Sequence, residues 1–321
     1  MNLNLVLLKN LETMYKIILL LTALVLSSIG LRAQEFQGMA VYESKTSTAD
    51  FKTRMEGNKN ITPEMMKNIE DRMKKMFEKT FILNFDKSAS IYKEEEKLDA
   101  PGQDGGGGMR MMASMTGGGG TYYKNVKDKS YTVDKEFMGK EFLVKDTLTN
   151  LKWKMEGETR VIGGYNCYKA TAVRPVSKTD FRNFRPRDEK KDETKKDETK
   201  KDATEKVAEP KKTSFMDELD VPKEVTITAW YTPEIPVNQG PEGYWGLPGL
   251  ILEVNDGKTV ILCSKVVLNP KEKAAIKPAT NGKVINQKDF DETVIKKMEE
   301  FREMNRGRGG NNGGFRMRIG G

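Results

Sequence analysis

The chain has 321 residues, of which 32% are charged and 37% apolar, and it carries a formal net charge of +8. It contains no histidine, which excludes mechanisms with an imidazole base and the common histidine-containing zinc and haem sites. Its length suffices for a sizeable core, although charged and glycine-rich residues concentrate in segments that cannot contribute to one.

Residues 1–33 have the layout of a cleavable secretory signal peptide. Met14 to Lys16 form a short basic start, Ile17 to Leu26 form an apolar run, and Ala33 is a small residue at the expected cleavage point. The run is too short to span the apolar core of a bilayer, which is about 30 Å thick. We therefore predict an exported protein that is periplasmic, outer-membrane-associated or secreted, and not a transmembrane protein. Met14 is an alternative true start.

Three segments have compositions typical of disordered chain. Residues 101–120 hold two runs of four glycines, residues 181–214 hold the repeat KKDET, KKDET, KKDAT, and residues 306–321 are rich in glycine and arginine. So few apolar side chains cannot offset the entropy cost of ordering by burial. We interpret the first two as inserts in a single β-rich domain of residues 34–305, and the last as a tail.

The remaining sequence alternates in the manner of antiparallel β-strands. The expected strands are residues 36–44, 80–86, 90–95, 121–126, 130–134, 141–145, 151–155, 165–173, 224–231, 250–254 and 258–268. Asn255-Asp256-Gly257 is a strong signal for a short hairpin between the last two.

Two amphipathic helices interrupt the strands. Thr62 can cap the first and Pro63 can take its opening position. Asp291 is the expected cap of the second, with Phe290 placed to pack against Ile295. The apolar stripes are Met66, Ile69, Met73 and Met76/Phe77 in the first helix and Val294, Met298 and Phe301 in the second.

A single apolar stripe suits a helix that lies against one face of a sheet. The expected fold is therefore mainly β (α+β): one curved antiparallel sheet or half-barrel of about 9–11 strands with two helices packed on its concave face. Such a fold would leave an apolar cleft, which methionine-rich helix faces could line.

A Gly-Leu-Pro-Gly stretch precedes the strand at residues 250–254. Proline presets φ near −65° and glycine permits φ > 0, which are the demands of the two central positions of a type II turn. A reactive loop would need a nucleophile, base or ligand beside it, and only Glu242 and Glu253 are near. We predict a structural turn formed by Gly246, Leu247, Pro248 and Gly249.

Four stretches together resemble the GLPGLI family of exported proteins from Bacteroidetes-type bacteria. They are VIGGYNCYKATA (161–172), AWYTPEIP (229–236), GP (240–241) and GLPGLILEV (246–254), and the resemblance extends over residues 36–268. It implies a signal peptide, a β-rich envelope protein and no established activity, and it supplies no catalytic residues. Family genes often lie near TonB-dependent outer-membrane transporters, which implies an envelope partner.

The two cysteines, Cys167 and Cys263, both lie on expected strands. In an oxidising compartment two remaining cysteines often pair, and closing so long a loop is worth up to about 4–5 kcal/mol in the chain-entropy model. A disulfide and two buried free thiols both remain open. A reactive thiol is disfavoured because no histidine is present to activate it.

Thioether sulfur, which selects Cu(I), is concentrated in the first glycine-rich insert. The candidate copper ligands are Met109, Met111, Met112 and Met115, and the alternative is a solvated loop that happens to be rich in methionine. Ser90-x-x-Lys93 matches a serine–lysine nucleophile pattern, but it lies on a strand instead of at a helix start. No pair among the acidic residues stands out for glycoside chemistry.

These observations favour a non-enzymatic periplasmic or envelope binding or accessory protein. Its ligand would be an apolar molecule or an envelope protein, including a TonB-dependent transporter. The alternatives are copper handling by the methionine-rich insert and, third, an unrecognised hydrolase. The basic tail resembles RNA-binding segments in composition, but an exported protein meets little nucleic acid, so no nucleic-acid partner is predicted.

Overall fold

The structure is a computed structural model that describes most of the chain between residues 36 and 306. The described residues are 14–19, 36–49, 52, 61–95, 120–176, 179, 185–186, 219–220 and 223–306. Residues 14–19, within the expected signal segment, are helical. The rest of that segment, most residues of the two expected inserts, and residues 307–321 lie outside the described part.

One open sheet of twelve strands dominates the fold. Its order is β14-β6-β5-β4-β3-β2-β1-β13-β12-β11-β8-β7, and every neighbouring pair is antiparallel except β14 with β6. The strands are β1 (Gly38–Thr46), β2 (Glu78–Phe85), β3 (Ala89–Glu94), β4 (Thr121–Asn125), β5 (Ser130–Phe137), β6 (Lys140–Thr147), β7 (Lys154–Ile162), β8 (Tyr165–Pro175), β11 (Glu224–Thr232), β12 (Leu250–Asn255), β13 (Thr259–Leu268) and β14 (Lys283–Ile285). A separate pair, β9 (Arg185–Pro186) and β10 (Leu219–Asp220), brings together the two ends of the segment that contains the KKDET repeat.

The prediction of a mainly β fold with one large sheet is confirmed, while several of its details are wrong. The sheet has twelve strands and is mixed, because β14 was missed and runs parallel to β6. Residues 151–153 are not part of a strand, and β7 starts at Lys154. Residues 148–153 instead form the linker from β6 to β7, and Leu148 and Leu151 are buried in it. The strand was predicted at residues 151–155 because apolar residues in a buried linker give the same alternating pattern as a strand.

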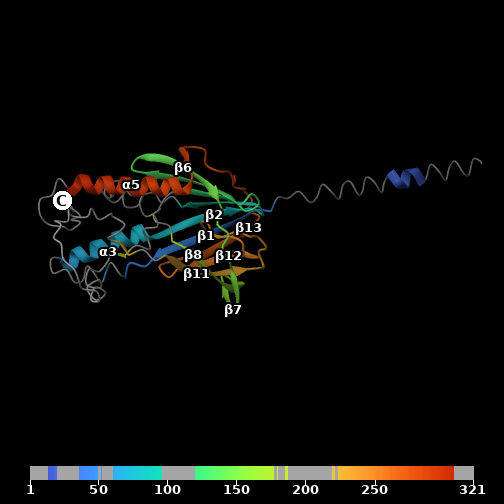
Figure 1. Cartoon of the computed structure of the whole chain (residues 1–321). Helices are drawn as coiled ribbons and strands as arrows, with labels where there is room; N and C mark the ends of the chain where they lie inside the picture. Colours follow the sequence, from blue (N-terminus) through green and yellow to red (C-terminus); the bar gives the residue numbers. More distant parts are fainter. Residues whose placement is uncertain are drawn as a thin grey trace, which may run out of the picture.

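The first helix, α3 (Pro63–Phe77), begins as predicted. Thr62 is the cap, and its hydroxyl accepts a hydrogen bond from the Met65 amide at 3.2 Å. The helix does not cover the sheet, however: none of its residues is buried, and it projects beyond the strand ends (Figure 1). The physical reason is the absence of a connecting loop, because β2 starts at Glu78, directly after Phe77. Without a turn the helix cannot fold back over the sheet.

The second helix, α5 (Gln287–Arg306), begins four residues earlier than the predicted cap at Asp291. Two oxygens satisfy its first amides: Asn286 Oδ1 accepts from Asp289 N at 2.8 Å, and Asp146 Oδ2 from β6 accepts from Gln287 N at 3.1 Å. The apolar stripe packs on β5 and β6, forming a cluster of Phe137, Phe142, Val144, Phe290, Val294 and Met298. None of the described helices is long and apolar enough to cross a membrane.

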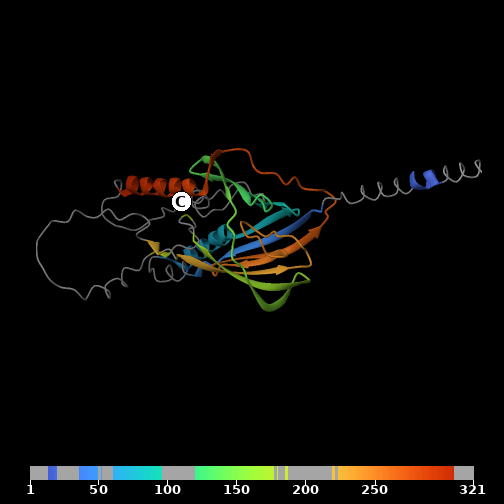
Figure 2. The ribbon, with the colours of Figure 1, turned by 45° about the vertical axis from the view of Figure 1, so that its right-hand side comes forward.

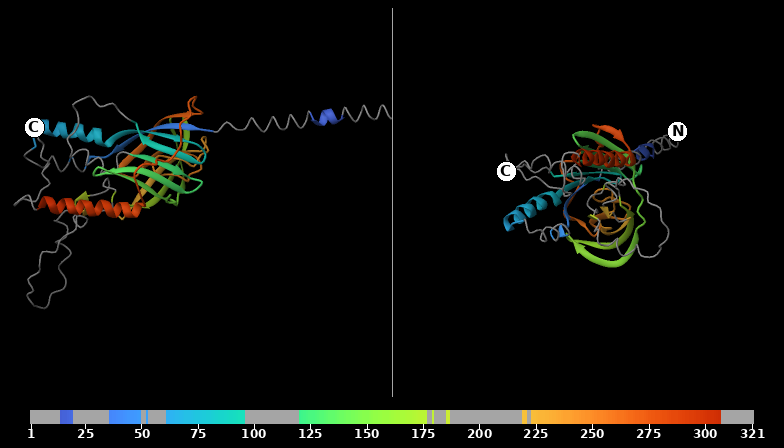
Figure 3. Two further views of the ribbon diagram at one scale, coloured as in Figure 1. Left: turned by 90° about the horizontal axis from the view of Figure 1, so that it is seen from above. Right: turned by 60° about the vertical axis from the view of Figure 1, so that its left-hand side comes forward.

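The connection from β11 to β12, residues 233–249, is called the interior loop below because it lies inside the curve of the sheet (Figure 3, right). Its buried side chains are Ile235, Val237, Gln239, Tyr244, Trp245 and Leu247. Ile235 and Val237 pack in one core cluster with Tyr42, whereas Tyr244 and Leu247 pack in a second with Ile227. Each fully buried apolar side chain contributes about 1.5–3 kcal/mol. The chain itself therefore fills the hollow that the sequence suggested as a ligand cleft.

Helix α5 and the interior loop lie against the same face of the sheet. Lys124 on β4 is opposite Tyr131 on β5, and Tyr131 is opposite Asp146 on β6, so the three side chains share one face. The Lys124 side chain reaches the interior loop, whereas Asp146 reaches the first turn of α5. Figure 2 shows α5 on one side of the sheet and the β7–β8 hairpin at the other end. The concave face thus carries one helix and one loop, not two helices.

Candidate functional site: the interior loop and its lysine anchor

The Gly246–Gly249 stretch forms a bend before β12, as predicted, but its two glycines have roles different from those expected. The left-handed φ belongs to Gly246 (+92°), and Gly249 does not have a positive φ. Gly249 is required for close approach, because a Cβ there would lie 2.1 Å from the Thr232 carbonyl oxygen. The type II assignment was therefore wrong, while the scaffold interpretation agrees with the burial of Leu247 and Leu250.

Lys124 anchors the interior loop to the sheet. Its side chain is buried, with the residue only 1% exposed, and its Nζ donates to the carbonyl oxygens of Gly240 at 2.8 Å, Glu242 at 3.0 Å and Tyr244 at 2.9 Å. An ammonium group has three N–H donors and no acceptor, which matches three carbonyls. The anchor comes from TYYKN, where Lys124 takes the inward position of the strand alternation. No sequence pattern distinguished this lysine from a solvated one.

The buried surroundings of Lys124 disfavour its charged form. Burial lowers its pKa from an ordinary value near 10.5 to about 7, and the negative charge of Glu242 opposes this shift. Its three hydrogen bonds are made to neutral backbone carbonyls instead of carboxylates. The site therefore suits structural anchoring, and its ionisation is poised near neutral pH.

Further hydrogen bonds fix the interior loop and the strand that follows it. Ser90 Oγ donates to Gln239 Oε1 at 2.9 Å, and the Tyr42 hydroxyl donates to the Ile251 carbonyl at 2.6 Å. Gln239 is fully buried, and its Nε2 has no hydrogen-bond partner in the structure. Such buried polar contacts hold a segment in one arrangement because breaking any one of them exposes an unsatisfied group.

Two tryptophans tie the interior loop to the linker 148–153. Trp245 Nε1 donates to the Thr149 carbonyl at 2.9 Å, and Trp153 Nε1 donates to the Trp245 carbonyl at 2.9 Å. This linker connects β6, next to one edge of the sheet, with β7 at the other edge. The reciprocal bonds therefore join both edge regions to the interior loop, although no ladder of strand hydrogen bonds closes the sheet.

Cys167 and Cys263 are both buried free thiols in the structure, and both belong to one core cluster. Burial raises the pKa of the Cys167 thiol to about 11 and that of Cys263 to about 12. A thiol of this kind is a poor nucleophile at neutral pH. Cys167 on β8 and Cys263 on β13 are separated in the sheet order by β11 and β12. A negative charge on Cys167 would nevertheless raise the pKa of Cys263. A disulfide between them stays a prediction.

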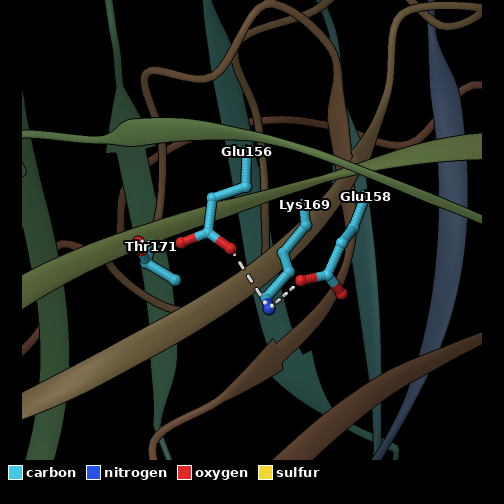
Figure 4. A network of polar contacts seen from close by, with 4 residues as sticks. All are labelled: Glu156, Glu158, Lys169 and Thr171. Carbon is cyan, nitrogen blue, oxygen red and sulfur yellow. Dashed lines mark hydrogen bonds and ion pairs between the residues drawn. The ribbon is translucent and has the colours of Figure 1, made fainter.

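A second lysine, Lys169, lies in a partly exposed network on β7 and β8 (Figure 4). The pairing of the two strands shifts between Met155 and Thr159, which is a bulge that places Glu156 and Glu158 around Lys169. Lys169 Nζ lies 3.1 Å from Glu156 and 2.8 Å from Glu158. The Thr171 hydroxyl and Lys169 lower the pKa of Glu156, while both carboxylates raise the pKa of Lys169. Bulge and charges together protect an edge strand from pairing with other chains.

The remaining predicted sites are not assembled in the described residues. Met109, Met111, Met112 and Met115 lie outside them. Ser90 points inward to Gln239, whereas Lys93 is exposed, as expected for strand residues three apart, so the serine–lysine pair does not form. Within the described ranges no three His, Cys, Asp or Glu side chains are grouped to hold a metal ion.

One part of the chain is similar to a known family model. Residues 153–253 match the model of a family described as "Protein of unknown function (Porph_ging)". The matched residues extend from Trp153 through β7, β8, β11 and the interior loop into β12, whereas Lys124 lies outside the match. No curated protein matches the chain.

Two solved structures share an overall likeness with the chain. They are titled "Structure of PNGF-II in C2 space group" and "Structure of PNGF-II in P21 space group", each with 15% sequence identity and a TM-score of 0.41. Each match covers 82% of this chain but only 33% of the other, so the chain spans about one third of the length of those proteins.

Proposed function

We propose that this protein is an exported, non-enzymatic binding or accessory protein of the bacterial cell envelope. The signal-like layout of residues 1–33 supports export, and the match of residues 153–253 to a family of unknown function is consistent with a protein that has no recognised catalytic motif. The motif at Gly246–Ile251 further supports membership of the GLPGLI family, whose gene neighbourhoods suggest a TonB-dependent outer-membrane transporter as partner.

The observation that carries the proposal is the state of the chemically reactive groups in the described residues. Lys124 is buried and bound by three carbonyls, and the thiols of Cys167 and Cys263 are buried with raised pKa. The half-buried Lys169 is paired with two carboxylates. These groups stabilise the fold instead of meeting a substrate, so binding through the outer surface is the function that this part of the chain supports best.

A cross-linking scan in the native envelope tests this proposal. A photo-reactive amino acid would replace, one at a time, an exposed residue on four different elements: Met65 on α3, Tyr168 on β8, Leu262 on β13 and Met304 on α5. We expect one position to give a cross-link to an outer-membrane transporter, while the other three serve as matched controls. Cleavage of chromogenic ester, phosphate or glycoside substrates by the purified chain would overturn the proposal, as would a scan without any transporter cross-link.

Copper handling is a second candidate because α3 adds thioethers to those of the methionine-rich insert. Met66, Met73 and Met76 lie on its apolar stripe, and none of them is buried. Thioether ligands select Cu(I). Titration calorimetry with Cu(I) would compare the wild type with M66L/M73L/M76L and with a variant in which Met109, Met111, Met112 and Met115 are serine. Equal affinity of all three proteins would eliminate copper handling.

A further inference from the structure

Helix α3 keeps its apolar stripe outside the core. The apolar side chains recur at three-to-four spacing along one side of the helix. They are Met66, Ile69, Met73, Met76 and Phe77, none of which is buried. None of the three core clusters in the described part of the chain contains a residue of α3. A stripe in this position favours contact with a further apolar surface, because such contact removes apolar area from water.

Positive charges border this stripe. With about 3.6 residues per turn, Lys67 and Lys74 lie along one border of the stripe and Arg72 along the other, and all three are exposed. The acidic Glu64 and Asp71 lie on the opposite side of the helix. Long basic side chains beside an apolar stripe keep their stems on it and extend their charged ends away from it. This is the pattern of a helix that lies in a membrane–water interface.

Helix α3 and the last turns of α5, together called the projecting end below, extend beyond the strand ends at the same end of the sheet (Figure 1; Figure 3, left). Met304, near the end of α5, is 66% exposed there. Residues 307–321 continue from α5 and contain Arg308, Arg316 and Arg318 but no acidic residue. The basic tail therefore starts at the projecting end.

We propose that the projecting end binds the surface of an anionic phospholipid bilayer, with α3 lying in the plane of the interface. The stripe of α3 contacts the boundary of the acyl chains, while Lys67, Arg72 and Lys74 reach the phosphates. The arginines of residues 307–321 add attraction to the same surface, since each basic residue near an anionic membrane raises the affinity about fivefold. This inference goes beyond the proposed function and does not depend on a transporter partner.

Charge favours a lipid surface over a second copy of the chain as the occupant. Two projecting ends in contact would bring lysines and arginines of the same sign together, which disfavours their association. Glu70, the acidic residue of α3 nearest to the stripe, is already paired with Lys52 at 2.9 Å. An anionic bilayer instead offers the complementary charge over its whole area.

Hydrogen exchange of the full chain tests the proposal. The chain is mixed with vesicles of phosphatidylcholine, either alone or with an equal amount of phosphatidylglycerol. Exchange in residues 63–77 should slow by about tenfold with the anionic vesicles only, because the basic residues favour the bound state. Residues 158–166, at the tip of the β7–β8 hairpin and away from α3 in Figure 1, should show no change. Residues 1–33 are present in every protein compared, so their own affinity for lipid is common to all.

A matched pair of variants separates the border of α3 from positive charge in general. K67Q/K74Q should raise the lipid concentration needed for half-maximal protection by about 25-fold, since two basic residues are lost. K87Q/K127Q removes the same charge from the β2–β3 and β4–β5 turns, at the other end of the sheet, and should behave like the wild type.

A third variant, I69Q/M73Q, shortens the apolar stripe and keeps every charge, so it should weaken the protection as well. Neither residue is buried, so the thermal unfolding midpoint of the chain should not change. Unchanged exchange in α3 with the anionic vesicles would overturn the proposal, as would an equal loss in K87Q/K127Q. Protection of α3 that rises with protein concentration in the absence of vesicles would contradict it too, because the occupant would then be a second copy.

Discussion

Lys124 and Lys169 show two opposite ways in which this sheet accommodates a lysine. Lys124 lies under the interior loop, bound to three backbone carbonyls, and burial lowers its pKa to about 7. Lys169 lies on the outside between Glu156 and Glu158, and these carboxylates raise its pKa. A buried lysine thus organises a loop at a cost in desolvation, whereas a partly exposed ion pair adds little stability.

The largest expected effect comes from removing the buried lysine. K124M leaves three buried carbonyls without a donor, so we expect the free energy of unfolding to fall by about 3 kcal/mol at pH 8. The loss should be smaller at pH 6, because the substitution also removes a buried charge. Urea denaturation measures both values. K169M is the matched control, and a midpoint shift as large as that of K124M would refute the contrast between the two lysines.

The next effect concerns the backbone contact under the Gly-Leu-Pro-Gly bend. G249A places a Cβ 2.1 Å from the Thr232 carbonyl oxygen, and such overpacking costs about 2–3 kcal/mol. G157A, in the bulge of β7, meets no atom within 4 Å and should change stability by less than about 0.5 kcal/mol. Thermal unfolding of the two variants compares these sites. Equal stability of G249A and G157A would show that the close approach is not obligatory.

A smaller effect is the pH dependence of global stability. Because the folded pKa of Lys124 is below its unfolded value, the unfolded chain binds more protons, and stability rises by about 1.4 kcal/mol from pH 6 to pH 8. Cys167 and Cys263 act in the opposite direction, since raised folded pKa values cause stability to fall above about pH 9. The free energy of unfolding, measured by chemical denaturation, should therefore be greatest near pH 8.5. A K124M variant that retains the rise would assign it to another group.

The smallest effect is expected at the partly exposed network around Lys169. The pKa of Glu156 is lowered by the Thr171 hydroxyl and by Lys169, so its contribution is present at neutral pH and is lost as the carboxylate is protonated in acid. E156Q should leave the unfolding midpoint at pH 7 nearly unchanged, because solvent and salt screen an ion pair that is partly exposed. Measurement at low and high salt would sharpen the comparison: a large loss at either salt concentration would mean that the bulge depends on this carboxylate.

Predictions from the sequence succeeded where the determining contacts are local. The Thr62 cap was correct because the accepting hydroxyl and the donating amide are three residues apart. The hairpin at Asn255-Asp256-Gly257 was correct for the same reason: the Asp256 side chain accepts from the amides of Lys258 and Thr259, and Gly257 takes a φ of +84°. Each of these signals can be read within five residues.

The errors arose where distant residues decide. The start of α5 was placed at Asp291, but its first turn is capped locally by Asn286, which the prediction missed, and also by Asp146, 141 residues before Gln287. A positive φ was assigned to Gly249, yet the nearby Thr232 carbonyl excludes a side chain there for a different reason. Strand alternation in residues 151–153 reflected packing in a linker, as the burial of Leu151 in the second core cluster shows.

The sequence alone determined the predominance of β-strands, the cap of α3 and the bend before β12. Alternation, capping and turn chemistry each act over a few residues. Only the tertiary structure decided that residues 233–249 fill the concave face and that Lys124, which reads as an ordinary polar strand residue, anchors them. The physical reason is that the Lys124 partners lie between 116 and 120 residues away, so burial and charge there depend on how the whole sheet curves.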